Sequence, residues 1–222
     1  MDQQKLIQLI TETVKETIEQ SSGSFQRLHK TDIPIAVSNR HVHLSSEDLE
    51  WLFGRNYELT KLKELSQPGQ FAAKETVTII GPKGKLPNVR ILGPSRGKTQ
   101  VEISLTDGFI IGTQPPVKLS GDINGTPGVI IQGPRGQLKI KEGLICAARH
   151  IHMHPTDADA FGVTNGDIVK IGVDGKRSII FDKTLIRVSP KYRLEMHIDF
   201  DEANAANLKS GTIGKLIRTE LS

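Results

Sequence analysis

The histidines carry the clearest chemical signal in this sequence. Two His-x-His pairs, His41/His43 and His150/His152, lie far apart in the chain, each within a short run rich in apolar residues. In a β-strand, residues i and i+2 lie on one face about 6.5–7 Å apart. Two imidazoles at that spacing can converge on one metal ion, each about 2.0–2.1 Å from zinc. One such pair is common among ordinary surface or core histidines, but two copies favour metal binding.

The two pairs also share a local context. Arg40 and Arg149 precede them, and a helix start with acidic residues follows each pair. The similarity between residues 40–49 and 149–158 is short. It suggests two equivalent points of a pseudo-symmetric scaffold that hold the same chemistry.

Each pair needs at least one further ligand to hold a metal ion with a position left open. His197 lies in an alternating strand pattern and shares a face with Glu195 and Asp199, and Glu102 lies in a similar pattern. Imidazole and carboxylate ligands suit Zn²⁺ or a similar divalent ion. The pattern does not assign either ligand to a pair, and a solvated strand carboxylate is an equal alternative for Glu102.

Short strands must position these residues. Turn signals recur between short apolar runs after residue 32, and the predicted strands span 33–37, 76–80, 89–92, 100–104, 128–131, 137–140, 168–173, 178–181, 185–188, 193–198 and 212–217. Three short helices fit between them, over 45–53, 156–161 and 202–208. This density of strands predicts a mainly β fold with two small β-barrel domains and short capping helices.

The N-terminal segment has a different pattern. Residues 2–20 place Leu6, Ile7, Ile10, Val14 and Ile18 on one stripe at helical spacing, which predicts an amphipathic helix. The Ser/Gly run 21–24 then predicts a flexible linker. Such a short helix must pack against something, either its own domain or a sister subunit, or a groove of another protein.

Composition excludes several classes of protein. Charged residues make up 24% and hydrophobic residues 36%, which is typical of a folded globular chain. The net charge is only +4, aromatic residues make up 5%, and long Lys/Arg runs are absent, so nucleic acid is a poor candidate partner. A single cysteine supports no disulfide framework, and neither a membrane span nor a signal peptide is evident. We therefore expect a soluble intracellular protein.

Four blocks of the chain, residues 33–45, 68–77, 92–102 and 148–153, resemble the PduL-type phosphate acyltransferases, also called phosphate propanoyltransferases. Their order along the chain makes the resemblance specific, and it extends from about residue 32 to residue 217. The resemblance implies two β-barrel domains with a di-zinc site between them. It also implies the interconversion of acyl-CoA plus phosphate with acyl phosphate plus CoA.

The resemblance assigns roles to particular residues. The implied ligands of the first zinc are His41, His43 and Glu102, and those of the second are His150, His152 and His197. Arg96 is the implied catalytic and phosphate-binding residue. The implied CoA contacts are Val37, Ser38, Asn39, Lys83, Arg90 and Asn204. For Lys83 and Arg90, a role as solvated cations is an almost equal alternative.

The resemblance also implies domain boundaries and a location. A leader helix over 1–21 and a linker over 22–32 precede a first barrel built from 33–39 plus 148–222, and residues 40–147 form the second barrel. Members of this family occur with bacterial microcompartments, including those for propanediol degradation. We therefore expect residues 1–20 to bind shell or core proteins and place the protein in the microcompartment lumen, with the cytoplasm as the alternative, and we expect a homo-oligomer.

Several alternatives stay open at this stage. Cys146 invites a covalent acyl-enzyme, but its apolar neighbours favour inert packing. His154 departs from the family pattern. It is either an added metal ligand or a surface residue, and its place before Pro155 favours the surface role. A cupin-like enzyme with one metal ion and a non-enzymatic module stapled by zinc are the rival functions. The acyl chain, propanoyl or acetyl, is not determined by any recognisable pocket residue.

Overall fold

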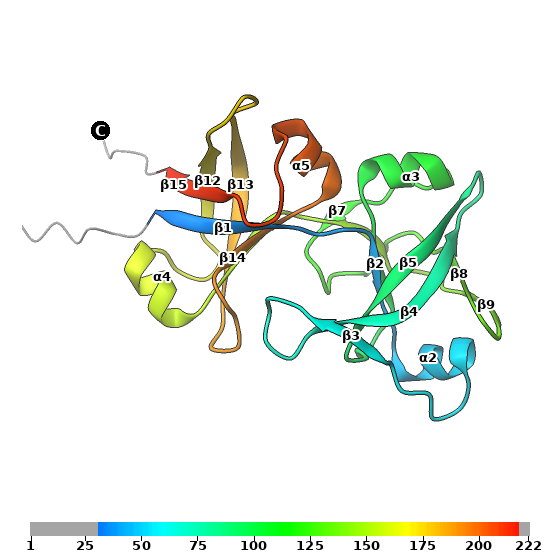
Figure 1. Ribbon diagram of the computed structural model, residues 1–222. Coiled ribbons are helices and arrows are strands. Elements are labelled where there is room, and N and C mark those ends of the chain that lie inside the picture. Colours follow the sequence, from blue (N-terminus) through cyan, green and yellow to red (C-terminus); the bar gives the residue numbers. More distant parts are fainter. Residues whose placement is uncertain (1–30, 218–222) are drawn as a thin grey trace, which may run out of the picture. The chain divides into compact units, whose positions relative to one another are not determined.

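The computed structural model describes residues 31–217, so the predicted leader helix and nearly all of the predicted linker lie outside the described residues. The fold is mainly β, as predicted (Figure 1). The elements of the first part are β1 (Asp32–Val37), β2 (His41–His43), α2 (Ser46–Phe53), β3 (Lys61–Glu64), β4 (Phe71–Ile80), β5 (Lys85–Gly93), β6 (Gln100–Glu102), α3 (Leu105–Ile111) and β7 (Val117–Lys118). The remaining elements are β8 (Ile130–Gly133), β9 (Gly136–Lys139), β10 (Leu144–Ala147), β11 (His150–Met153), α4 (Pro155–Phe161), β12 (Ile168–Val173), β13 (Ile179–Val188), β14 (Glu195–Ile198), α5 (Phe200–Ala206) and β15 (Ile213–Ile217).

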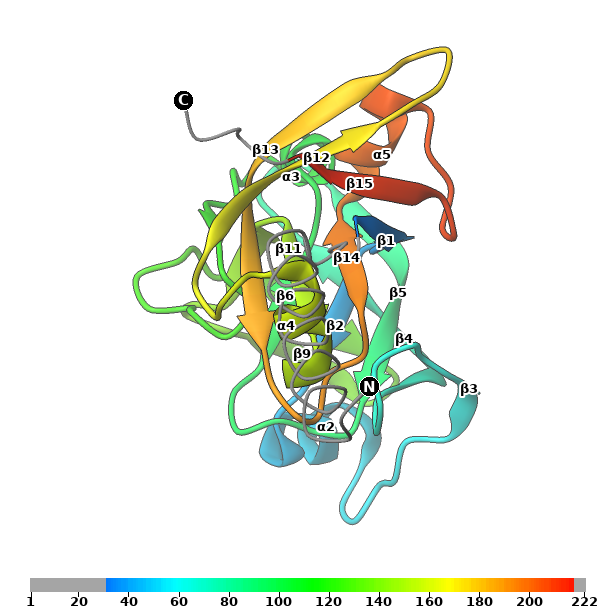
Figure 2. The same cartoon turned by 90° about the vertical axis from the view of Figure 1, so that its left-hand side faces the viewer.

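Six strands close into a barrel in the order β1-β14-β11-β13-β12-β15 (Figure 2). Burial alternates along these strands: in β15, Gly214 and Leu216 are buried while the residues between and beside them are exposed. This alternation is what a two-residue repeat produces when one face of the strand packs inward. The barrel is filled by side chains such as Ile35, Phe181 and Met196.

The other strand system is a nine-stranded sheet in the order β7-β10-β6-β2-β5-β4-β8-β9, with β3 paired to β4. It has its own core, in which Leu44, Ile79, Ile91 and Ile131 are fully buried. Two hydrophobic cores that share no residue therefore stabilise the barrel and the sheet.

The chain passes between these two strand systems. β1 belongs to the barrel and β2, only a few residues later, belongs to the sheet; in Figure 1 the blue segment that joins these two strands runs from one system to the other. It returns between β10 and β11. The loop between β3 and β4 also bonds directly to the barrel part of the chain. The Gln67 amide donates to the Arg193 carbonyl (3.0 Å) and accepts from the Arg193 N–H (3.2 Å), and Ser66 hydrogen bonds to Glu195 in β14.

The helices α2, α4 and α5 begin at polar caps, close to where the sequence predicts them. The Ser45 hydroxyl accepts from the Asp48 N–H at the start of α2. The His154 ring accepts from the Thr156 N–H at α4, and the Asp199 carboxylate accepts from the Glu202 N–H at α5. These caps satisfy backbone donors that the first turn of a helix leaves free. Among the described residues, no helix has both the length and the apolar character that crossing a membrane requires.

The predicted elements differ from the structure in three ways. The predicted strands omit five that are only two to four residues long, too short to show a clear two-residue repeat: β2, β3, β7, β10 and β11. The runs 178–181 and 185–188 form one strand, β13, because Asp182 and the positive φ of Lys183 (52°) bend the strand without ending it. The helix α3 is missing from the predicted elements, although Ser104 and Asp107 form a complete capping box before it and Gly112 ends it in the left-handed conformation. Gly108 and the two isoleucines at 110 and 111 weaken its helical pattern.

Candidate functional site

The structure brings the six predicted metal ligands to one cavity of about 870 Å³. Strands of the sheet supply His41, His43 and Glu102, and strands of the barrel supply His150, His152 and His197. Two groups of residues that lie about a hundred positions apart in the chain thus face the same space. The described residues that line it also include Arg96, Arg187 and Tyr192.

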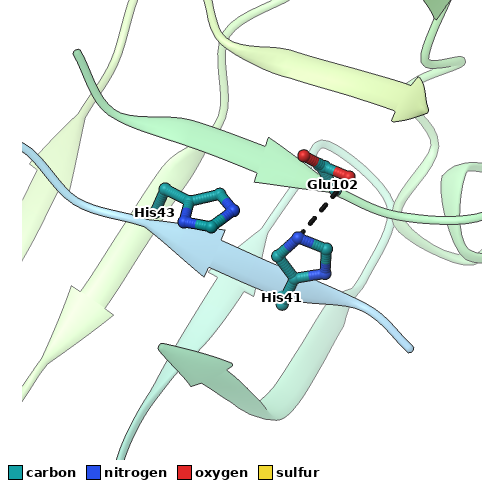
Figure 3. A group of neighbouring side chains, drawn as sticks. All are labelled: His41, His43 and Glu102. Atoms are coloured by element: carbon teal, nitrogen blue, oxygen red, sulfur yellow. Dashed lines mark ion pairs between the residues drawn. The ribbon is translucent and has the colours of Figure 1, made fainter. Parts of the chain in front are cut away.

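The first group of ligands lies on two neighbouring strands. β2 and β6 are antiparallel with His41 directly opposite Glu102, while His43 is two residues along the same strand (Figure 3). The candidate donor atoms of the three side chains all lie within 4.8 Å of one another. The His41 Nε2 and Glu102 Oε2 atoms are 3.5 Å apart. These distances suit a single divalent ion between the three side chains.

The Glu102 carboxylate is held by neighbours on its other oxygen. Oε1 accepts hydrogen bonds from the Gln100 amide (2.5 Å) and from the Ser120 hydroxyl (2.7 Å). Burial opposes the charged form of Glu102, but His41 and the Ser120 hydroxyl outweigh burial and hold its pKa well below the usual range. Glu102 is therefore an anion whose Oε2 remains directed at the histidines.

The second group is a cluster of imidazole rings. The ring centroids of His150 and His152 are 4.7 Å apart, and those of His150 and His197 are 5.2 Å apart and nearly parallel. The His152 ring lies 4.9 Å from His197 and stacks on Tyr192 at 4.0 Å. His197 Nε2 is 3.2 Å from the Glu195 carboxylate. The sequence places Glu195 on the same face as His197, and the structure agrees.

The two groups occupy matching positions in their strand systems. β2 lies between antiparallel β6 and parallel β5, and β11 lies between antiparallel β14 and parallel β13. Glu102 faces His41 across one pair, and His197 faces His150 across the other. The similarity of the two local sequences therefore has a structural counterpart, in which Glu102 takes the place of His197.

The arginine before each His-x-His pair makes an equivalent ion pair in both strand systems. Arg40 binds Asp107 (2.9 Å), and Arg149 binds Glu202 (2.6 Å). Asp107 and Glu202 are the third residues of α3 and α5, where each also closes a capping box. Each ion pair thus ties the start of one His-x-His strand to the helix that follows the strand of the third ligand.

The same backbone contact orients the first histidine of each pair. The Nδ1 atom of His41 hydrogen bonds to the Asn39 carbonyl (2.8 Å), and that of His150 to the Ala148 carbonyl (2.9 Å). Because Nδ1 donates to a carbonyl, Nε2 of each ring is left with its lone pair. This is the second-shell arrangement usual for histidines that bind metal ions.

The other rings hold nitrogens without partners. Among the described residues, the buried side-chain nitrogens that lack a hydrogen bond include Nδ1 of His43 and both ring nitrogens of His152. Nε2 of His197 also makes no hydrogen bond, but the Glu195 carboxylate lies 3.2 Å from it. Burial lowers the pKa of His43 to about 3 and that of His150 to about 4, so both rings are neutral near pH 7. Neutral rings with free buried lone pairs are what a divalent metal ion requires, so the residues present fit zinc.

The other predicted contacts divide into two sets. Arg96, Val37, Ser38, Asn39 and Arg90 line the cavity, and the Arg90 guanidinium also donates to the Ala73 and Lys74 carbonyls. Lys83 and Asn204 are not among its lining residues. Lys83 lies in the β4–β5 turn beside α3, and Asn204 is on the exposed side of α5.

The two residues with open roles have structural explanations. The Cys146 thiol is buried and lies 3.2 Å from the Asp199 carboxylate. Burial and that carboxylate raise the pKa of the Cys146 thiol, so it is a poor nucleophile. The His154 ring caps α4, where its Nδ1 atom lies 2.8 Å from the Thr156 hydroxyl.

Sequence reasoning missed Arg187 and Tyr192. Arg187 is aligned with His152 across β11 and β13, and Tyr192 stacks on that same ring. The only signal for Arg187 is a lone cation in the apolar run 185–188. That signal becomes meaningful only when the strand that pairs with β11 is known.

Comparison with known proteins agrees with the resemblance found in the sequence. A family model described as phosphate propanoyltransferase matches residues 34–209. The chain belongs to the phosphate propanoyltransferase family. A relative of that name from Thermotoga maritima is 60% identical over 191 residues, covering 85% of this chain and 91% of the relative.

Other members of the family align over even more of the chain. Relatives called phosphate propanoyltransferase from Priestia megaterium and Sebaldella termitidis are 53% and 47% identical. They cover 94% and 98% of this chain, and 95% and 100% of their own lengths. The family consists of transferase enzymes, which agrees with the resemblance found in the sequence blocks.

Proposed function

We propose that this protein transfers a short acyl group between CoA and inorganic phosphate at a site with two zinc ions. One zinc ion would be held by His41, His43 and Glu102, and the other by His150, His152 and His197. The observation that carries this proposal is that both sets of ligands line one cavity and carry unpartnered buried nitrogens. Membership of the phosphate propanoyltransferase family supports the same reaction.

The reaction follows from simple acyl-transfer chemistry. A phosphate oxygen attacks the thioester carbonyl carbon, a C–O bond forms, the C–S bond breaks, and CoA leaves as a thiolate that takes a proton from solvent. Zinc bound at these residues supplies a Lewis acid near the developing oxyanion and a soft position for the leaving sulfur. Inorganic phosphate is already anionic at pH 7, so no strong general base is needed.

The residues of the chain orient the reactants. Arg96 lines the cavity, and its guanidinium can bind two phosphate oxygens at once, which fixes the direction of attack. The transfer is direct within a ternary complex, because the buried Cys146 thiol does not supply a nucleophile. Holding both substrates in one cavity converts an encounter of two molecules into a reaction within one complex.

CoA would occupy the part of the cavity lined by Val37, Ser38, Asn39 and Arg90. Lys83 and Asn204, which lie outside that lining, would contact the part of CoA that extends beyond it. The acyl group is propanoyl, with acetyl as a slower substrate. One methylene is worth only about 1–3 kcal/mol in a hydrophobic pocket, so we expect both to react.

A combined metal and activity measurement tests this proposal. We expect two zinc ions per chain by elemental analysis, and CoA release from propanoyl-CoA that depends on inorganic phosphate. His43→Ala and His152→Ala should each lose one zinc ion and most of the activity. His154→Asn is the matched control, because this ring caps a helix outside the cavity.

The rival functions give different results. One metal ion per chain would favour a cupin-like enzyme. Two tightly held zinc ions without turnover in either direction would favour a structural module. Phosphate-independent release of CoA would indicate hydrolysis and contradict the proposed transfer to phosphate.

We also propose that residues 1–20 direct the enzyme into the lumen of a bacterial microcompartment, and that the enzyme works as a homo-oligomer. The amphipathic stripe of residues 2–20, separated from the rest of the chain by a Ser/Gly run, supports a docking role for this segment.

A further inference from the structure

Arg187 approaches the candidate site from the barrel, whereas Arg96 approaches it from the sheet. Arg187 lies in β13 directly beside His152 in β11. Arg96 follows β5, where its N–H donates to the Leu44 carbonyl (2.9 Å) at the end of the β2 segment. Both side chains line the cavity that holds the six candidate ligands. Two guanidinium groups from different strand systems therefore reach one space.

These two arginines lack the carboxylate partners that Arg40 and Arg149 have. Arg40 and Arg149 are each bound to a carboxylate. Within residues 31–217, neither Arg96 nor Arg187 has an Asp or Glu oxygen within 4.0 Å. An arginine without a carboxylate, in the wall of a cavity, keeps its donors free for an anionic ligand.

The two guanidinium groups are close enough to affect each other. Burial lowers the pKa of Arg96, the charge of Arg187 lowers it further, and Glu102 partly opposes this shift. Among the described residues that line the cavity, Glu102 is the carboxylate, and it already pairs with His41. The cavity thus holds more positive than negative charge, which favours a bound anion.

An aromatic ring holds Arg187 in place. Its guanidinium carbon lies 5.8 Å from the centroid of the Tyr192 ring, and the same ring stacks on His152 at 4.0 Å. A cation–π contact orients a guanidinium without using its N–H donors in an ion pair. Arg187 is therefore positioned beside the imidazole cluster with its donors available.

We propose that Arg187 is a second phosphate-binding residue, which grips the transferred phosphate together with Arg96. The proposal rests on the proposed function, since it names how that site binds its phosphate substrate. The ligand is inorganic phosphate, or the phosphate end of an acyl phosphate in the reverse direction. The phosphates of CoA are excluded because the pantetheine arm separates them from the thiol, which reacts beside the histidines.

The effect of substitution is measured on the two substrates separately. We expect Arg187→Gln to raise the KM for inorganic phosphate about ten- to a hundred-fold, because a charged hydrogen bond is lost. The KM for propanoyl-CoA should change less than about threefold. Arg187→Lys should lie in between, because lysine keeps the charge but not the fork of donors. Arg193→Gln, an exposed change outside the cavity, is the matched control and should behave like the unsubstituted enzyme.

A binding measurement separates this proposal from the proposed function. Inorganic phosphate should raise the Tm of the zinc-loaded enzyme relative to chloride at equal ionic strength, and Arg187→Gln should reduce that rise at unchanged zinc content. An equal rise in both variants, an unchanged KM for phosphate, or a rise in the KM for propanoyl-CoA instead would overturn the role of Arg187. If the unsubstituted enzyme forms no acyl phosphate, the proposed function fails, and the Tm difference still decides whether Arg187 binds phosphate. Should Arg187→Gln fold poorly by circular dichroism, Arg187→Lys decides both readouts.

Discussion

Burial keeps individual imidazole rings of the site in their neutral form. His43 and His150 are buried, and the cost of burying an imidazolium keeps their pKa values low. Glu102 is buried as well, but it is charged, because two hydrogen-bond donors and His41 stabilise its negative charge. At His43, His150 and Glu102, a divalent ion would therefore meet ligands that are already in the protonation state it needs.

The stability of the metal-free protein should depend on pH in a predictable direction. A histidine whose pKa is lowered by folding takes up its proton in the unfolded chain first, so acidification favours unfolding. The free energy of unfolding should fall as pH drops from about 6.5 to about 4, with each such histidine contributing up to about 1.4 kcal/mol per pH unit. His41, whose pKa Glu102 raises despite burial, adds stability that is fully present below pH 6.5 and is lost as the pH rises above that value and through the raised pKa of His41.

Urea unfolding at several pH values after removal of metal by a chelator measures this slope. His150→Gln should flatten it, and His154→Asn should leave it unchanged because its ring lies outside the cavity. A slope that His150→Gln leaves unaltered would contradict the role assigned to burial.

At the residue scale, the sequence predicts those parts of the site that depend on spacing along one strand. His41 with His43, and His150 with His152, follow from the two-residue repeat of a strand. Arg187 and Tyr192 do not follow, because they reach His152 from another strand and a loop. Strand pairing is decided by the packing of the whole barrel, and no local pattern encodes it.

At the scale of elements, one arrangement occurs twice. A strand with an Arg-His-x-His sequence pairs with a strand that supplies the third ligand, and the arginine binds the capping carboxylate of the helix that follows. Two elements that carry different ligands are thereby tied together. The geometry of each ligand set therefore depends on an ion pair that does not itself touch the metal position.

Breaking one of these ion pairs should weaken one metal position selectively. Arg149→Met leaves Glu202, whose pKa burial already raises, without its partner, and we expect a loss of about 1–2 kcal/mol in the free energy of unfolding. Zinc held by the barrel histidines should then be lost first in a chelator titration.

Arg40→Met is the matched control, and it should weaken the zinc held by His41, His43 and Glu102 instead. Equal weakening of both zinc ions by either substitution would show that the pairs stabilise the fold in general and not the adjacent ligands.

The sequence predicts most elements of the fold, and the errors have local causes. Runs with clear alternation, such as β12, have the predicted bounds. The sequence predicts two strands in place of β13 because Asp182 and Lys183 resemble a turn, and only pairing with β12 and β11 keeps the strand continuous. α3 contains a glycine and β-branched residues, and its stability comes from its caps and from contacts with β5.

At the scale of the whole molecule, the N-terminal segment can be tested apart from the site. No residue before 36 lines the cavity among the described residues. We expect deletion of residues 1–22 to leave kcat and both KM values within about twofold, and to release the enzyme from microcompartments on co-expression with shell proteins.

Activity of the purified deletion variant and its sedimentation with shells are the two measurements. As a milder control, Ile10→Glu with Val14→Glu should remove the apolar stripe at full chain length. Loss of activity or of oligomeric state in both variants would show that the segment is structural, and retention in shells would contradict the docking role.

The path of the chain determines how two fragments of the protein could reassemble. A break between β10 and β11 would leave the first fragment with the whole sheet and, at its front end, a single strand that completes the barrel. The second fragment would be an open five-stranded ring, missing the strand between β14 and β15. The fragments would have to rejoin by donation of that strand, and each successful reunion would also rebuild the shared pocket, so that recovered enzyme activity would report complementation directly.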